Sequence, residues 1–256
     1  MKLNKLIAIA TISLLSGGIS MAQKALNLED IVAGNVIQTK GIGSMTWLKD
    51  GERYSRLENN KQTGGTDIVA YQAKDNSREV IIPSSLLTDK STGKPIPARS
   101  ISWSADNEKV LIYNNTQRVW RYDTRGDYWV LNLKDGALRQ LGKGMPESSM
   151  MFAKFSPDGT RVAYVSNNNI YVEDIDSGKI TQLTKDGSDT IVNGTFDWVY
   201  EEEFSCRAGF RWSTAGKHIA YWQRGTKGTG VFDLINTVNS SYAKVTHLPH
   251  PQTGTN

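Results

Sequence analysis

The sequence predicts an all-β protein, a β-propeller made of four-stranded antiparallel blades. Four segments share one signature, an aromatic residue followed by a short polar turn and an alternating apolar strand: "MTWLKDGERYSRL", "ISWSADNEKVLIY", "AKFSPDGTRVAYV" and "FRWSTAGKHIAYW". Asp-Gly and Ser-Gly turns separate further short strands, which is typical of a meander of antiparallel hairpins. A long period built of strands alone indicates propeller blades, whereas an ordinary β-sandwich gives no reason for the recurring signature.

The aromatic residue of each signature marks the start of a blade. These anchors are Trp47, Trp103, Phe155 and Trp212, and the intervals between them are 56, 52 and 57 residues. Blades are therefore expected from about Gly41 onward, about four of them in this chain, with an open edge where later blades belong. Helical patterns are scarce, and "LNLEDIVAG" near the N-terminus is one short candidate.

The first residues have the three regions of a secretory signal peptide. Lys2 and Lys5 give a positive start, an apolar run follows, and Ser20-Met21-Ala22 is a small-residue cleavage site. The apolar run is too short for a membrane span. There is no cysteine near the cleavage site, so a lipid anchor is not indicated. Residues 1–22 are therefore predicted to be removed after Ala22, leaving a secreted or periplasmic protein; the alternative is a buried N-terminal helix.

Composition narrows the possible partners. Without Lys2 and Lys5 the chain has 28 basic against 26 acidic side chains, a net charge of +2, and no Lys/Arg stripe suggests nucleic acid. Cys206 is the single cysteine of the sequence, so it has no partner for an internal disulfide. Residues 23–256 are long enough for one large domain, which must be stabilised by its core.

Comparison of the repeats isolates two insertions, where function is expected because loops on a rigid scaffold often carry it. The second repeat has 11 extra residues at 116–126, the arginine segment, which contains Arg118, Arg121 and Arg125. The connection before the fourth anchor is 15 residues longer than its counterpart. It contains "FDWVYEEE", residues 196–203, the acidic segment.

The three adjacent glutamates have more than one explanation. A solvated acidic turn balanced by a neighbouring arginine is the ordinary one, since surface charge runs usually contribute little. Trp198 and Tyr200 precede the run and favour instead a partly buried, shaped site. Adjacent carboxylates without alternating spacing make a poor calcium loop, so neither a metal nor another cofactor is predicted.

Three stretches resemble dipeptidyl peptidase IV, in the prolyl oligopeptidase family of serine peptidases: "DWVYEEE", "VWRYDTRGDYWVLNL" and "FSPDGTRVAYVSNNNIYVED". The resemblance covers nearly all of the mature chain. It implies that Glu202 and Glu203 grip the free α-ammonium of a peptide substrate. It also implies that Arg121 binds a substrate carbonyl and helps to hold the glutamates, with Glu201, Trp198 and Tyr200 in support.

The same resemblance implies a larger protein. The family has an eight-bladed propeller followed by an α/β-hydrolase domain, releases dipeptides with proline or alanine in second position, and is expected to form homodimers. An amine clamp fits the chemistry, because two carboxylates can share the three N–H donors of an ammonium. Neighbouring residues of a helix point about 100° apart, so Glu202 and Glu203 need a bend or the end of a short helix. Glu201 is then expected to serve structure.

The catalytic part of such a peptidase is not found in this sequence. No G-x-S-x-G elbow occurs, and the three histidines, His218, His247 and His250, are explained as a strand residue and two exposed loop residues. The chain is therefore predicted to be the recognition part of a secreted exopeptidase, without a catalytic triad and inactive alone. The alternatives are a TolB-like periplasmic propeller that binds a peptide or protein partner, and a tripeptidyl peptidase or pseudoenzyme.

Overall fold

The computed structural model describes residues 27–32, 41, 43–238, 240–252 and 254. The chain divides into two compact units, Met1–Ile42 and Gly43–Asn256. In the first unit the structure describes one short helix, α2 (Leu28–Val32), at the position of the helical candidate "LNLEDIVAG". The predicted signal peptide, residues 1–22, lies outside the described residues. The strands and the candidate site belong to the second unit.

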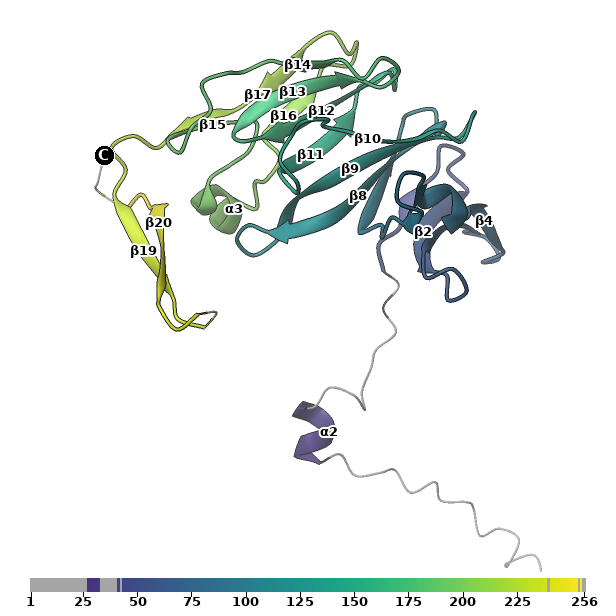
Figure 1. The fold of residues 1–256 in the computed structure, drawn as a ribbon, viewed down its shortest axis with the longest axis horizontal. Helices are drawn as coiled ribbons and strands as arrows, with labels where there is room; N and C mark the ends of the chain where they lie inside the picture. The colour runs from purple at the N-terminus through teal and green to yellow at the C-terminus, as the bar shows by residue number, and fades with distance from the viewer. Residues whose placement is uncertain (1–26, 33–40, 42, 239, 253, 255–256) are drawn as a thin grey trace, which may run out of the picture. The chain divides into compact units, whose positions relative to one another are not determined.

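The second unit begins with three groups of four consecutive strands (Figure 1). The first group is β1 (Thr46–Trp47), β2 (Arg53–Asn59), β3 (Thr66–Gln72) and β4 (Arg78–Ile82). After a 3-10 turn, η1, and a small hairpin come the strands of the second group. These connecting and second-group elements are η1 (Ser84–Leu87), β5 (Thr88–Asp89), β6 (Lys94–Pro95), β7 (Ser100–Trp103), β8 (Lys109–Arg118), β9 (Asp123–Asn132) and β10 (Leu138–Gln140).

The third group is complete, and the segment after it is more broken. The third group is β11 (Met150–Phe155), β12 (Arg161–Ser166), β13 (Asn169–Asp174) and β14 (Ile180–Gln182). The remaining elements are β15 (Ile191–Asn193), α3 (Trp198–Phe204), β16 (Phe210–Trp212), β17 (Ile219–Tyr221), β18 (Gln223–Gly225), β19 (Val231–Asn236) and β20 (Lys244–Pro249).

Within each group every strand pairs antiparallel with the next along the chain. This is the meander of a propeller blade, as the sequence predicts. One pair of residues, Met150 and Gly126, also joins β11 to β9, so the second and third groups form a continuous sheet. Farther on, β16 pairs with β17, β15 with β18 and β19 with β20, each as a two-stranded sheet. The number of blades, four here and eight in a whole propeller, stays a prediction.

The recurring signature is a tight turn with one backbone geometry. Each anchor ends the first strand of its group, and the residue four positions later has a left-handed backbone in all four repeats. These positions are Gly51, Asn107, Gly159 and Gly216, with φ of 72°, 60°, 66° and 66°. Glycine and asparagine tolerate this region best, which explains why only these two residue types occupy the position.

A serine after the anchor closes the turn in three of the repeats. Its hydroxyl oxygen accepts a hydrogen bond from the backbone amide of the residue five positions later. That residue is the first of the next strand or directly precedes it. The pairs are Lys109 N to Ser104 Oγ at 2.9 Å, Arg161 N to Ser156 Oγ at 3.0 Å and His218 N to Ser213 Oγ at 3.1 Å. His218, expected within a strand, directly precedes β17, and its place is explained by the repeat.

Two of the anchors also connect successive groups. The indole Nε1 of Trp103 donates to Ser55 Oγ of β2 at 2.9 Å, and that of Trp212 donates to the carbonyl of Lys154 in β11 at 3.3 Å. Each bond joins the first strand of one group to the group before it. An aromatic residue with a donor at this position thus helps to set how neighbouring sheets stack.

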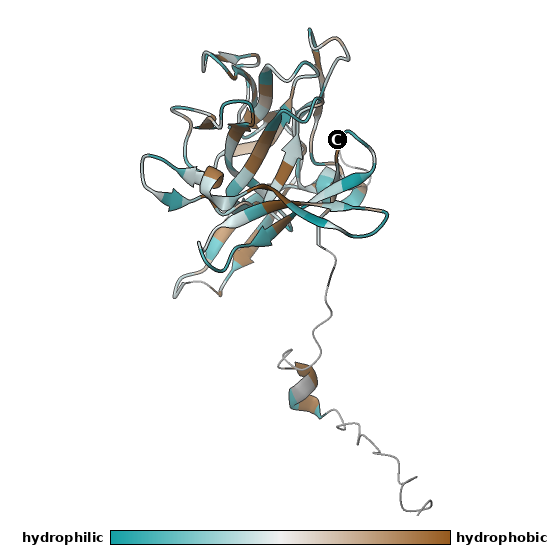
Figure 2. Cartoon of the chain, turned by 90° about the vertical axis from the view of Figure 1, so that its right-hand side faces the viewer, coloured by the Kyte–Doolittle hydropathy of each residue, from teal (hydrophilic) through white to brown (hydrophobic). Residues whose placement is uncertain are grey.

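The core lies between successive groups of strands, and the inner strands carry continuous apolar runs that are buried, such as residues 110–112 of β8 and 162–165 of β12 (Figure 2). One cluster joins the first and second groups through residues such as Ile68, Ile82, Val110 and Leu131. A second joins the second and third groups and includes Tyr164, which is fully buried. A third, around Phe210, joins the third group to β16. In the described part of the chain no helix is long and apolar enough to cross a membrane.

We predict that a Cβ at the left-handed turn position lowers the free energy of unfolding of the protein. Gly51 has φ of 72°, and nothing lies within 4 Å of the place that a Cβ would take, so replacement by alanine meets backbone strain and no clash. Gly51→Ala is expected to lower the free energy of unfolding by about 1–2 kcal/mol, and Gly51→Asn by less. Urea unfolding measures both.

Gly225 is the matched control for this prediction. It also has open space around it, but its φ is not in the left-handed region. Gly225→Ala should leave the free energy of unfolding unchanged or raise it slightly. Equal losses for Gly51→Ala and Gly225→Ala would show that backbone strain at the turn is not the cause.

Candidate functional site

The acidic segment forms a short capped helix, α3. Asp197 precedes it with extended backbone, and its carboxylate accepts a hydrogen bond from Tyr200 N at 3.0 Å. This is a side-chain N-cap, which supplies a partner for an amide that the first turn leaves free. Ser205 ends the helix in a left-handed conformation with φ of 53°. Glu202 and Glu203 lie in its last turn, so the short helix that the sequence required is present.

Aromatic rings and one arginine fix the orientation of α3. The ring of Tyr200 stacks on Phe196 at 5.5 Å and contacts Phe204 at 5.2 Å between ring centroids. The guanidinium carbon of Arg224 lies 3.7 Å from the centroid of the same Tyr200 ring. Arg224 also forms an ion pair with the capping Asp197 at 3.2 Å. The helix start is therefore held to the segment around β18.

The arginine segment is a hairpin extension and not an irregular loop. Strands β8 and β9 have ten residues each and continue into the insertion, with shifts of register near Asn114 and Gln117. Residues 119–122 form the tip, where Val119 N donates to the carbonyl of Tyr122 at 3.0 Å. Long paired strands hold this tip more rigidly than a free loop could.

The tip of this hairpin meets the acidic helix. Arg121 Nη2 lies 2.7 Å from Glu202 Oε2, and the Glu202 side chain is 9% exposed while that of Arg121 is 70% exposed. The structure thus brings together two predicted site residues that are 81 positions apart in the sequence. It leaves Arg118 and Arg125 without an ion pair among the described residues.

The three glutamates occupy three different environments. Glu201 is buried, Glu202 is ion-paired and mostly shielded, and Glu203 is exposed, with no ion pair among the described side chains. Burial raises the pKa of Glu201 above the usual glutamate value, the positive charge of Arg207 lowers it, and the neighbouring Glu202 raises it. Its Oε1 has no hydrogen-bond partner in the described part of the chain. Glu201 therefore faces the protein interior.

Trp198 and Tyr200, the two aromatic residues that precede the glutamates, are half-buried. The Tyr200 ring contacts Phe196 before the helix and Phe204 at its end, and the ring of Trp198 lies 5.4 Å from that of His250. The explanation of His250 as an exposed loop residue is wrong, because the residue is half-buried and also contacts Phe232. His247 is exposed but lies in β20, paired with Asp233 at 2.7 Å.

Sequence reasoning missed several residues around the helix. Arg224 and Arg207 come from segments beyond the insertion, and Tyr122 from the tip of the hairpin. Arg207 and Arg224 stand in no motif, and Tyr122 stands in the arginine segment without an expected role. Their ring contacts join positions 24 and 85 residues apart, so no pattern of spacing indicates them. No group of three or more His, Cys, Asp or Glu side chains that could hold a metal occurs in the described part.

A cavity of about 420 Å³ lies beside this site. Trp120 of the hairpin tip and Trp198 of the helix line it together with Arg125, Asp189 and Leu248. Its walls are mainly apolar with a few charged groups, which is usual for pockets that bind small ligands.

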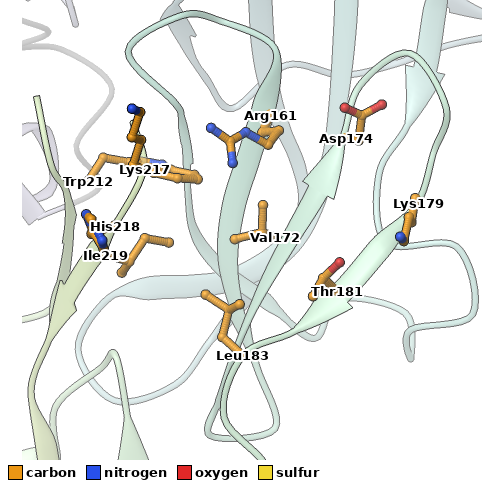
Figure 3. Close-up of a pocket in the computed structure, with 10 residues that line it drawn as sticks. All are labelled: Arg161, Val172, Asp174, Lys179, Thr181, Leu183, Trp212, Lys217, His218 and Ile219. Carbon is orange, nitrogen blue, oxygen red and sulfur yellow. The ribbon is translucent and has the colours of Figure 1, made fainter. Parts of the chain in front are cut away.

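A second hollow, of about 240 Å³, lies elsewhere between the third group and β16–β17 (Figure 3). Val172, Leu183 and Ile219 form its apolar part, and Arg161 lies with its guanidinium carbon 5.2 Å from the ring centroid of Trp212. None of its lining residues belongs to the acidic or the arginine segment. It borders β17, which pairs with β16 alone among the described strands.

Known proteins resemble this chain in sequence and in fold. A family model described as "Dipeptidyl peptidase IV (DPP IV) N-terminal region" matches residues 104–256. A probable dipeptidyl-aminopeptidase B of Chaetomium globosum is 33% identical over 138 residues, which cover 54% of this chain and 15% of that protein. One from Aspergillus oryzae is 26% identical over 218 residues, covering 80% of this chain and 23% of that protein.

Among solved structures, Porphyromonas gingivalis dipeptidyl peptidase 4 matches with a TM-score of 0.77 and 23% identity, covering 90% of this chain and 32% of that one. This likeness confirms the predicted fold class, an all-β propeller portion. The chain spans less than a quarter of the length of the Chaetomium and Aspergillus relatives.

The N-cap of α3 gives a prediction about local stability. Asp197→Ala removes the acceptor for Tyr200 N and the partner of Arg224, a loss of about 1–2 kcal/mol from the cap alone. Asp197→Asn retains a capping oxygen and removes only the charge. Hydrogen exchange at the Tyr200 amide should speed up in the alanine variant and be largely restored in the asparagine variant. Equal exchange in Asp197→Ala and the unaltered protein would contradict the role of the cap.

Proposed function

The chain belongs to the dipeptidyl peptidase IV N-terminal region family, and from this premise we propose that it is the substrate-recognition propeller portion of a secreted serine exopeptidase. The enzyme releases dipeptides with proline or alanine in second position from peptides with a free N-terminus. The observation that supports this most directly is the Arg121–Glu202 pair at 2.7 Å beside the exposed Glu203.

The proposed binding step is the capture of an ammonium by carboxylates. A free peptide N-terminus presents one positive charge and three N–H donors, and charge-assisted hydrogen bonds to carboxylate are stronger than neutral ones. Glu202 is held in place by Arg121 and is mostly shielded from water, where an ion pair with substrate is less screened. Glu203 supplies the second carboxylate from the exposed side of the helix.

Arg121 has a second proposed task. With one Nη on Glu202, its 70% exposed guanidinium still has donors free for a substrate carbonyl. A clamp that binds the amine and the first carbonyl together measures distance from the chain end. A nucleophile at a fixed distance then cuts after the second residue, which makes the enzyme an exopeptidase.

The chemistry itself is assigned to residues outside this sequence. Cleavage needs a serine nucleophile with its histidine and aspartate, and we propose that an α/β-hydrolase domain of the same protein supplies them. Residues 1–22 are proposed as the signal peptide and residues 23–256 as propeller. Family membership favours this assignment over a TolB-like binding propeller. The other alternative is a pseudoenzyme, and peptidase activity of the full-length gene product would exclude it.

The clamp is tested by removing either partner of the proposed contact. Removal of one partner of a desolvated charge pair costs about 2–5 kcal/mol. Glu202→Ala or Glu203→Ala in the full-length gene product should therefore lower kcat/KM for a Gly-Pro reporter by on the order of thirty-fold or more. Acetylation of the peptide N-terminus should have a comparable effect on the unaltered protein, because it removes the charge.

Two further variants complete this test. Arg121→Ala should impair dipeptide release while the protein stays folded, since Arg121 is exposed at the hairpin tip. Glu79→Ala removes an exposed glutamate of β4, 68% exposed and far from the helix in sequence, and should leave kcat/KM unchanged. Equal cleavage of acetylated and free peptides by the unaltered protein would rule out the amine clamp.

We also propose that the whole protein is a homodimer and that the β19–β20 ribbon takes part in the contact. All six residues of β19 are exposed, including Phe232 at 51% and Ile235 at 66%. A two-stranded ribbon has little stability of its own in water, and exposed apolar patches of this kind often mark interfaces. Burial against the same ribbon of a second copy would remove this apolar area from water.

A charge on the ribbon should weaken such a dimer. Ile235→Lys is expected to shift the full-length gene product toward monomer at micromolar concentration, measured by sedimentation velocity. Val80→Lys, at a 39% exposed position on β4, is the matched control and should leave the sedimentation coefficient unchanged. A monomer in the unaltered protein, or a dimer that withstands Ile235→Lys, would count against this interface.

A further inference from the structure

Arg207 lies against the tip of the arginine hairpin. Its guanidinium carbon is 3.7 Å from the centroid of the Tyr122 ring, which is a close cation–π contact. Tyr122 follows Arg121 directly in the chain, and its carbonyl closes the turn at the tip. A contact that fixes the Tyr122 ring therefore also restricts where the neighbouring Arg121 can point.

The backbone of Arg207 is itself fixed. Its carbonyl accepts a hydrogen bond from Thr195 Oγ1 at 3.3 Å, and the next residue, Ala208, forms an antiparallel bridge with Thr195. Gly209 N also donates to the carbonyl of Gly194 at 2.9 Å. These bonds tie the segment after the acidic helix to the segment before it. The backbone of Arg207 is thus bonded to the segments that flank the acidic helix.

The positive charge of Arg207 acts on the buried carboxyl of Glu201, which lowers the pKa that burial raises. One oxygen of this carboxyl has no hydrogen-bond partner among the described residues. Arg207 Nε is likewise buried without a hydrogen bond in the described structure. The guanidinium therefore packs on an aromatic ring of the hairpin, with its Nε shielded from water.

Among the described residues, one ion pair joins the hairpin tip to the helix, that of Arg121 with Glu202, and Arg121 is 70% exposed. Val119 of the tip packs against the apolar cluster around Phe210 and leaves the Arg121 side chain unrestrained. An exposed arginine has many rotamers, and fixing it during substrate binding costs conformational entropy. A second contact one residue along the chain reduces this cost before the substrate arrives.

We infer that Arg207 is a positioning residue, which holds Tyr122 against the acidic helix and so sets the Arg121–Glu202 pair in place before a peptide amine binds. This inference rests on the proposed amine recognition and adds to it a residue outside the acidic and arginine segments. If Arg207 had only a structural role, its substitution would lower the stability of the protein but leave the selection between free and blocked amines unchanged.

The test measures that selection in the full-length gene product. The ratio of kcat/KM for a free peptide to that for its acetylated form reports amine recognition, whereas a general loss of folded protein lowers both values together. Arg207→Gln keeps much of the side-chain length and removes the charge and the contact. It is expected to reduce the ratio about five- to tenfold. Arg56→Gln is the matched control, because Arg56 also lies over a tyrosine ring, that of Tyr71 at 5.7 Å in the first sheet, and should leave the ratio unchanged.

Variants of Tyr122 approach the same contact from the other side. Tyr122→Leu removes the aromatic ring and should reduce the ratio as Arg207→Gln does, and the double variant should lose no more than either single one. Tyr122→Phe keeps the ring and should keep the ratio. Because Tyr122 is 39% exposed, these changes remain informative if Arg207→Gln does not fold.

The outcomes separate this inference from the proposed function. If the unaltered protein prefers free amines and both Arg207→Gln and Tyr122→Leu retain that preference, Arg207 is not a positioning residue. If the unaltered protein cleaves both peptides equally, the proposed amine recognition fails and this inference fails with it. A ratio that falls in Arg207→Gln and Tyr122→Leu, and stays unchanged in Arg56→Gln and Tyr122→Phe, supports it.

Discussion

The ion pair between Arg121 and Glu202 is the contact on which the rest of the site depends. At 2.7 Å, with the glutamate 9% exposed, it joins the hairpin tip of the second group of strands to a helix that follows the third group. A carboxylate taken out of water needs a partner, because an unpaired buried charge is costly. The pair therefore constrains both segments. It also requires that the sheets that carry them keep a fixed relation to one another.

That fixed relation comes from repeated local chemistry. Each repeat uses the same left-handed turn position, and in three of the four a serine hydroxyl closes the turn. Trp103 and Trp212 then connect a first strand to the preceding group through their indole nitrogens. Apolar clusters fill the space between successive sheets. These local bonds thus bring the two insertions, which are distant in sequence, close enough for Arg121 and Glu202 to form an ion pair.

The sequence predicts those features whose cause is local. The anchors, the turns, the strand pairs and the presence of two insertions follow from periodicity, and the site residues follow from a recognised motif. Arg207, Arg224 and His250 could not be predicted this way, because each acts on a ring or a charge from a distant part of the chain, and ring contacts leave no mark in spacing. The paired strands of the arginine segment were also missed, since "TQRVWRYDTRG" has no alternating apolar pattern to indicate them.

Three adjacent glutamates would repel one another if all shared one environment, and the structure separates them. Successive residues of a helix point about 100° apart, so the three side chains face the interior, the arginine hairpin and the solvent in turn. Glu201 is buried, Glu202 is paired with Arg121, and Glu203 has no ion pair among the described residues. One carboxylate is thus left for a cation from outside, next to one that is already held in position. In the proposed function that cation is the α-ammonium of a peptide, and Arg121 offsets the charge of the neighbouring Glu202.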